Sequence, residues 1–173
     1  MRTQRVRRFL DSLYRISGGL AAIFMVGVLV AVTLAIVTRQ LGTYIGGLDA
    51  YAGYSMAAAG FLALGHTFKK GEHIRVTLLL SSLPHKGRLR LDIFALIVAC
   101  LLTGNLCWFS WKLVYLSFMY KDISTADDAT ALWIPQTAMA LGTLVFFISV
   151  VDETLRRLRG QPEASNTEEV HYE

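Results

Sequence analysis

Charged residues are scarce in this chain, and their scarcity is local. Asp, Glu, Lys and Arg make up 17% of the 173 residues, against about a quarter in a typical soluble domain. Long stretches carry almost no charge, and short charged segments separate them. This distribution is typical of a membrane protein. The net charge of +4 does not indicate a nucleic-acid partner, because the basic residues flank apolar segments and form no continuous basic face.

Cysteine is nearly absent, and several catalytic motifs are missing. A helix would separate Cys100 and Cys107 by about 10 Å, which is too far for a disulfide. No Cys-x-x-Cys pair, HExxH helix or GxxxxGK[ST] phosphate loop occurs. A bis-histidine haem or a proton-coupled antiporter would need histidines or a carboxylate within an apolar span, and none lies at mid-span. We therefore expect neither ATP hydrolysis nor a cofactor or metal in this chain.

Four apolar segments are long enough to cross a membrane as helices. They cover about residues 19–38, 49–68, 91–119 and 132–155. The first has no charged residue and is followed by "RQLG" instead of a signal-peptide cleavage site, so we expect it to be retained. The third exceeds the bilayer thickness and should tilt. The sequence therefore predicts an all-α membrane protein with one four-helix membrane domain over 19–158.

The connection after the second span begins with "LGHTFKKGEHIRV" and continues with an apolar stretch that Pro84 ends. It is too short to cross a bilayer and too apolar for water, which predicts a short interfacial amphipathic helix at about 72–83. Lys69, Lys70 and Arg75 would lie among anionic head groups. His73 and its neighbour Glu72 suggest a metal site at first sight, but at a membrane rim we expect them to cap the turn or meet head groups.

Lys and Arg alternate in abundance along the chain. The basic segment 1–18, the connection at 69–90 and the tail hold fourteen of them, whereas the loop after the first span and the segment 112–131, which is the end of the third span and the loop after it, hold three. The positive-inside rule therefore predicts that both termini are cytoplasmic. Residues 159–173 are polar, and we expect disorder there. At the inner end of the last span, Arg156 and Arg157 are expected to form i,i+4 ion pairs with Asp152 and Glu153.

The second span is rich in small residues, which favour close helix packing in membranes. Gly53, Ala57 and Gly60 fall on a shallow face, which we expect to meet another subunit. Asp49 precedes this face and either caps the helix or pairs with a cation on that partner. In the third span, Asn105 either bridges helices or contacts a substrate, and Lys112 is expected to snorkel outward.

Several of these features occur together in one known family. The chain resembles the small membrane subunit, the DctQ type, of the tripartite ATP-independent periplasmic (TRAP) transporters. "TRQLG" after the first span, the basic-Gly turn followed by "HIRV", and "LWIPQ" opening the fourth span carry the resemblance over about residues 10–158. One departure is "GGLDAYAGY", which has a single acid, Asp49, where the family often has a tryptophan followed by paired acids.

The resemblance implies a non-catalytic component of a secondary transporter in the bacterial inner membrane. A periplasmic binding protein would deliver an organic anion, often a carboxylate, and a large membrane subunit would move it with coupled Na⁺. This chain would brace the large subunit and contact membrane lipids. Two alternatives are a membrane anchor or assembly subunit of a redox enzyme and an autonomous four-helix transporter.

Overall fold

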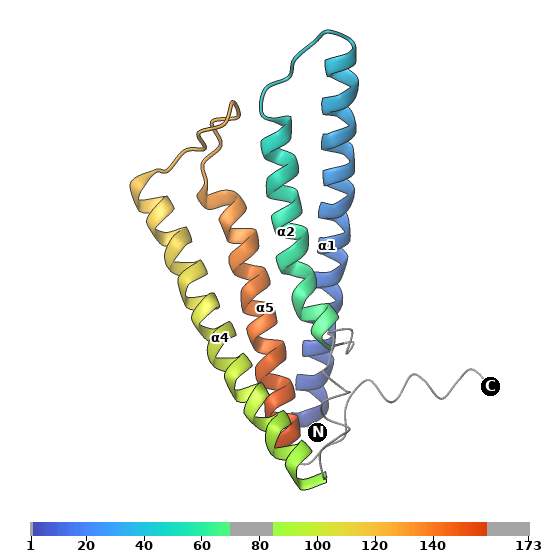
Figure 1. The fold of residues 1–173 in the computed structure, drawn as a ribbon, viewed down its shortest axis with the longest axis vertical. Helices are drawn as coiled ribbons and strands as arrows, with labels where there is room; N and C mark the ends of the chain where they lie inside the picture. Colours follow the sequence, from blue (N-terminus) through green and yellow to red (C-terminus); the bar gives the residue numbers. More distant parts are fainter. Residues whose placement is uncertain (1, 70–84, 159–173) are drawn as a thin grey trace, which may run out of the picture.

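The computed structural model describes residues 2–69 and 85–158, and this part of the chain is built of four long helices (Figure 1). They are α1 (Arg2–Gln40), α2 (Leu48–Lys69), α4 (His85–Tyr120) and α5 (Trp133–Leu158). In the described ranges, β-type pairing is limited to an isolated bridge between Ile123 and Ala131. The predicted all-α class is confirmed.

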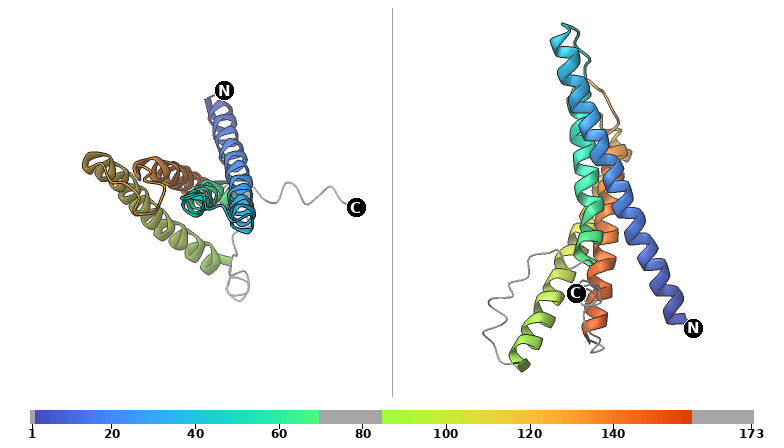
Figure 2. Two further views of the ribbon diagram at one scale, coloured as in Figure 1. Left: turned by 90° about the horizontal axis from the view of Figure 1, so that it is seen from above. Right: turned by 90° about the vertical axis from the view of Figure 1, so that its right-hand side faces the viewer.

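The helices stand side by side in a row instead of closing into a bundle. Figure 1 shows the spatial order α4, α5, α2, α1, and Figure 2 shows the same row from above and from the side. Within the row, α2 packs against both α1 and α5, and α4 packs against α5. The edge helices α1 and α4 therefore each have one principal neighbour in the described chain.

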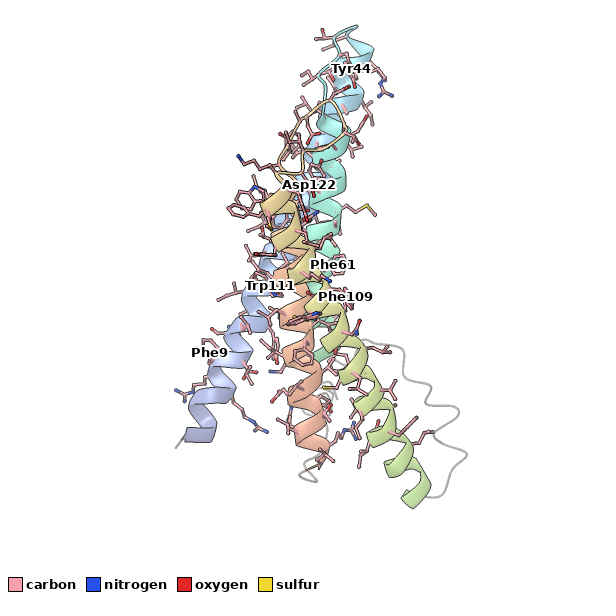
Figure 3. All side chains as sticks on the ribbon, turned by 90° about the vertical axis from the view of Figure 1, so that its left-hand side faces the viewer. Phe9, Tyr44, Phe61, Phe109, Trp111 and Asp122 are labelled. Atoms are coloured by element: carbon pink, nitrogen blue, oxygen red, sulfur yellow. The ribbon has the colours of Figure 1, made fainter. Side chains whose placement is uncertain are left out.

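The row has two ends, which we name by what they carry. The connections at residues 41–47 and 121–132 lie at the loop end, and the start of α1 and the finish of α5 lie at the terminal end (Figure 1). Tyr44 and Asp122, both labelled in Figure 3, belong to the loop end. Successive helices thus run in opposite directions, as short connections in a membrane domain require.

The helix bounds agree with the predicted spans for α2 and α5 but differ for α1 and α4. Residues 2–18 continue α1 as helix, and α4 begins at His85, before the apolar segment starts. Polar and basic residues can extend a helix beyond an apolar core, so the apolar pattern alone locates the span and not the helix end. The predicted interfacial helix at 72–83, with Lys70, His73 and Arg75, and the tail at 159–173 lie outside the described residues.

Three helices have the length and composition to cross a membrane: Arg7–Gln40, Leu91–Tyr120 and Trp133–Leu158. Among the described residues, α2 does not meet the same criterion of length and mean hydropathy. Much of α2 consists of alanine and glycine instead of large apolar side chains, and it lies between α1 and α5. The structure therefore supports three of the four predicted spans by composition.

The interior of the row consists mostly of small side chains, with a few larger ones such as Tyr14 and Val150. The buried residues of α2 are Ala52, Ala58, Ala59, Leu62 and Gly65, and those of α5 include Ala140, Gly142, Thr143 and Ser149. Large apolar side chains of α1 and α4 point outward instead, as in Ile23 and Leu101. Small residues inside and large apolar residues outside are the arrangement expected of helices packed within lipid.

Candidate subunit interface

The contact between α2 and α5 depends on two glycines. A Cβ built on Gly142 would lie 2.5 Å from the carbonyl carbon of Phe61, and one on Gly65 would lie 2.8 Å from Cγ1 of Val145. Both distances are shorter than real Cβ contacts allow, so the two backbones approach each other as only glycine permits. We call this contact the α2–α5 seam. It fixes which side of α2 faces inward.

The contact between α1 and α2 is polar at two points. The Ser17 hydroxyl donates to the carbonyl oxygen of Leu62 at 2.6 Å. Nδ1 of His66 lies 3.2 Å from the carbonyl oxygen of Tyr14, and because a carbonyl only accepts, Nδ1 carries the proton. The His66 ring occupies space that a side chain at position 18 would need, 3.0 Å from a Cβ built on Gly18. No sequence pattern indicated that His66 joins two helices.

A charged contact joins α1 and α2 at the terminal end. Lys69 forms an ion pair with Asp11 of α1, and its ammonium group lies 4.6 Å from the centroid of the Tyr14 ring. We expected Lys69 among lipid head groups. In the structure Lys69 instead contacts Asp11 of α1 in the same chain. This contact depends on the helical state of residues 2–18, which brings Asp11 beside the end of α2.

The predicted partner-facing residues lie on the side of α2 that the row leaves open. Asp49, Gly53 and Gly60 are exposed, and Ala57 is half-buried. Apart from the adjoining residues and backbone of α2 itself, no atom of the described chain comes within 4 Å of a Cβ built on Gly53 or Gly60. Met56, between them on the helix surface, is 68% exposed. We call Asp49, Gly53, Met56 and Gly60 the open α2 face.

Asp49 has a partner within its own chain. Its carboxylate lies 3.8 Å from the guanidinium of Arg39, and both side chains are more than 70% exposed, so the pair contributes little to stability. Because α2 begins at Leu48, Asp49 lies in the first turn and not at the cap position. A negative charge there interacts favourably with the helix dipole. The structure thus places Asp49 one residue inside the helix instead of at the predicted N-cap, and its contact with a cation on a partner stays a prediction.

The basic residues at the end of α5 form a network that reaches α4. Arg157 Nε lies 3.1 Å from Glu153 Oε1, which is the predicted i,i+4 pair, and Arg157 Nη1 lies 3.2 Å from Asp92 Oδ2. Arg156 approaches Glu153 at 4.0 Å. These side chains are half-buried. The contact between Arg157 and Asp92 joins elements far apart in sequence, and spacing within one helix could not indicate it.

At the loop end, the two connections dock onto each other and onto α2. The Tyr44 hydroxyl donates to Oδ2 of Asp127 at 2.7 Å, and the Tyr54 hydroxyl donates to Oγ of Ser124 at 2.8 Å. Gly47 has a φ of +84°, and a Cβ there would lie 2.7 Å from Cβ of Asp128. Glycine is required at this position both by its backbone conformation and by the close approach.

The docking shifts two pKa values in opposite directions. The hydrogen bond to Asp127 raises the pKa of Tyr44, because it stabilises the protonated phenol beside a negative charge. The nearby hydroxyl of Thr130 lowers the pKa of Asp128, because it favours the charged carboxylate. Over residues 2–69 and 85–158, no group of three or more His, Cys, Asp or Glu residues could hold a metal ion. The features of the described chain that can serve a function are therefore its helix faces and the contacts between its loop-end connections.

The comparison with protein families decides the identity of these helices. The family of the DctQ component of the tripartite ATP-independent periplasmic transporters matches residues 28–160, which is most of the chain. The chain belongs to the DctQ family. No curated protein matches it. The match covers the last third of α1, all of α2, α4 and α5, and both loop-end connections.

DctQ membership confirms the resemblance that the sequence motifs carried. A DctQ protein is the small permease subunit of a transporter with three kinds of component, and the family is not one of enzymes. Its partners are in kind a large membrane component and a periplasmic binding protein. The alternative of a redox-enzyme anchor is not favoured. Sequence reasoning found the family, and its subunit interface on α2 stays a prediction; it missed the seam glycines and the contact between Arg157 and Asp92.

Proposed function

We propose that this DctQ subunit braces the large TRAP membrane subunit during Na⁺-coupled uptake of an organic anion, a carboxylate, that a periplasmic binding protein delivers. The observation that carries the proposal is the open α2 face. Its glycines meet nothing in the described chain, although small residues in membrane helices favour close contact with another helix. Na⁺ coupling then belongs to the large subunit.

The proposal includes a topology. All four helices cross the bacterial inner membrane, with the terminal end in the cytoplasm and the loop end in the periplasm. The distribution of Lys and Arg supports this orientation. The position of α2 between α1 and α5 supports its crossing as well, because its polar backbone and small side chains are then covered on two sides. Lys70, His73 and Arg75 would meet head groups at the cytoplasmic surface.

The interface in this proposal consists of Asp49, Gly53, Ala57 and Gly60. A glycine on an exposed helix face lets a second helix approach closely, and a larger side chain prevents that approach. Asp49 lies at the periplasmic edge of the face. Its exposed pair with Arg39 is weak enough to exchange for a cation on the large subunit.

Co-purification with the large subunit tests the proposal. Gly53→Leu and Gly60→Leu should each reduce the amount of large subunit recovered, while the chain still inserts and folds. Gly19→Leu is the matched control, because a Cβ on Gly19 in α1 also meets nothing within 4 Å. Undiminished recovery with both α2 variants would remove the open α2 face as the interface. Failure of the wild-type chain to co-purify would remove the bracing function itself.

The transport activity needs a separate measurement. Vesicles containing both membrane subunits and supplied with the binding protein should accumulate a carboxylate only when a Na⁺ gradient points inward. Omitting this chain should abolish uptake. Uptake that persists without this chain, or that is indifferent to Na⁺, would contradict the proposed function.

A further inference from the structure

Helix α4 has two opposite stripes, and this row covers one of them. Its inner stripe is buried against α5 and follows spacings of four, three, four and three residues. It contains small or polar side chains for the most part: Thr103, Cys107, Ser110, Val114 and Ser117. Gly104, beside this stripe, receives the Phe147 ring of α5, with an atom 3.1 Å from a Cβ built on the glycine. The contact with α5 therefore uses one side of α4.

The opposite side carries an equally regular stripe that nothing in the described chain covers. Leu101, Trp108 and Tyr115 repeat every seven residues and are 70%, 71% and 64% exposed. Asn105 and Lys112 fall between them and are also exposed. Alternating spacings of four and three give a straight seam on a helix, the pattern that receives a second helix in left-handed packing. We call these five residues the outer α4 stripe, and Figure 3 looks onto the α4 side of the molecule.

Asn105 makes this stripe unlike a lipid-facing surface. It lies at the middle of the apolar segment Leu91–Tyr120, about 21 Å from either end at 1.5 Å per residue. Its amide can donate two hydrogen bonds and accept others, and the described chain provides it with no side-chain hydrogen-bond partner. An unsatisfied amide in hydrocarbon is costly, and polar residues inside membranes normally face protein.

Lys112 adds a charge on the same line. It lies seven residues after Asn105, about 10 Å further toward the loop end. Its ammonium group is 5.9 Å from the centroid of the Phe109 ring, so in this conformation the side chain is directed back along the helix and not toward the loop-end surface. The stripe thus presents an amide at mid-membrane and a cation nearer the periplasmic side.

We propose that a membrane-spanning helix of the large subunit packs on the outer α4 stripe, with a hydrogen-bonding side chain opposite Asn105 and an acidic one near Lys112. This inference rests on the proposed function and adds a second contact surface, since α4 packs against α5 and the open α2 face lies elsewhere in the row. A second copy of this chain fits worse. Two copies share one membrane orientation, so a symmetric pair through this stripe would bring Lys112 against Lys112, and like charges repel.

Photocrosslinking in membranes that contain the complete transporter tests the contact directly. A photoreactive phenylalanine derivative replaces Leu101 or Trp108 in the outer α4 stripe. Matched controls carry it at Ile23 or Leu29 of α1, which are 67% and 66% exposed. We expect an adduct between this chain and the large subunit from the α4 positions and none from α1. An adduct of two copies of this chain, adducts with lipid alone, or equal adducts from α1 would overturn the inference.

Substitution of the amide gives an independent test. Asn105→Leu should lower the recovery of large subunit about threefold to tenfold, the range expected for one interhelical hydrogen bond in a membrane. The isolated chain should unfold at the same temperature or higher, because the change removes a polar group from an uncovered face. Thr33→Leu, another exposed polar residue, on α1, should leave recovery unchanged. Equal recovery with Asn105→Leu, or a destabilised isolated chain, would overturn the inference.

The proposed function and the assignment of the outer α4 stripe would be contradicted by different results. If the wild-type chain does not associate with the large subunit, the proposed function is wrong, and the result is visible before any substitution is made. If association is intact but the α4 positions neither crosslink nor respond to substitution, only the assignment of the outer α4 stripe is wrong.

Discussion

Glycine has two opposite uses in this DctQ subunit, and the neighbouring atoms decide which one applies. Gly65 and Gly142 allow the backbones of α2 and α5 to touch, whereas Gly53 and Gly60 meet empty space. All four lie in small-residue helices and look alike in the sequence. A side chain added at Gly65 or Gly142 would strain the packing within the subunit. One added at Gly53 or Gly60 would disturb only the contact with a partner.

The seam glycines give a prediction about the isolated subunit. Gly142→Ala should destabilise it by about 1–3 kcal/mol, the usual cost of overpacking, because the new Cβ would meet the Phe61 backbone, which cannot rotate away. Thermal unfolding in detergent measures this. Gly60→Ala is the control and should be neutral or stabilising by up to about 1 kcal/mol through helix propensity. Equal unfolding temperatures for the two variants would contradict the seam.

Tyr44 gives a prediction about pH. Its raised pKa means that the hydrogen bond to Asp127 is fully present below the ordinary tyrosine value of about 10 and is lost as the pH rises through the raised value. Asp127→Asn should therefore lower the Tyr44 titration midpoint. Nuclear magnetic resonance of carbon-labelled tyrosine follows it, with Tyr44→Phe identifying the signal. An unchanged midpoint in Asp127→Asn would show that the loops are not joined through this contact.

At the scale of single helices, composition predicts where helices lie better than it predicts which helices touch each other. The bounds of α2 match the predicted span closely, because an apolar run between charged segments marks both ends. The helical state of residues 2–18 was not predicted, since that segment is polar. Its contact with α2 through Asp11 and Lys69 depends on two helices lying side by side. The open face of α2 was predictable from small-residue spacing, but the side that faces α5 was not.

The contact between Arg157 and Asp92 gives a prediction at this scale. Because α4 packs against α5, loss of a half-buried ion pair between them should loosen the terminal end of α4 first. Asp92→Asn should cost about 1 kcal/mol and speed amide hydrogen exchange in the first described turns of α4. Asp122→Asn changes the same kind of group in the exposed loop-end connection. Faster exchange of α4 in both variants alike, or in neither, would contradict the local effect.

The whole molecule is a row one helix thick, and its order differs from the order of the chain. The chain runs α1, α2, α4, α5, but α5 lies between α2 and α4 (Figure 1). Four apolar segments, two pairs of which are joined by short connections, predict antiparallel neighbours within each pair, and that pattern fits a closed bundle equally well. The choice of the row depends on Gly65 and Gly142, which bring α5 onto α2. Nothing in the spacing of α5 alone reveals which helix its glycine meets.

The orientation of this row gives the last prediction. In a variant without native cysteines, a cysteine at Thr43 or Thr125 should react with a membrane-impermeant thiol reagent added from the periplasmic side. A cysteine at Ser12 or Lys70 should react only after the membrane is opened. The reactivity of Lys70→Cys decides whether α2 crosses, because it follows α2 directly. Labelling of Lys70→Cys and Thr43→Cys from the same side would contradict four crossings.

The α2–α5 seam also has a consequence for the order in which the subunit is made. During synthesis α1 and α2 emerge together, and α1 can cover one side of α2 at once. The side that α5 will cover must wait until α4 has also been made, because α5 follows α4 in the chain. A surface of alanine and glycine exposes no charge to lipid during this delay, but it also favours close contact with any other helix that reaches it first.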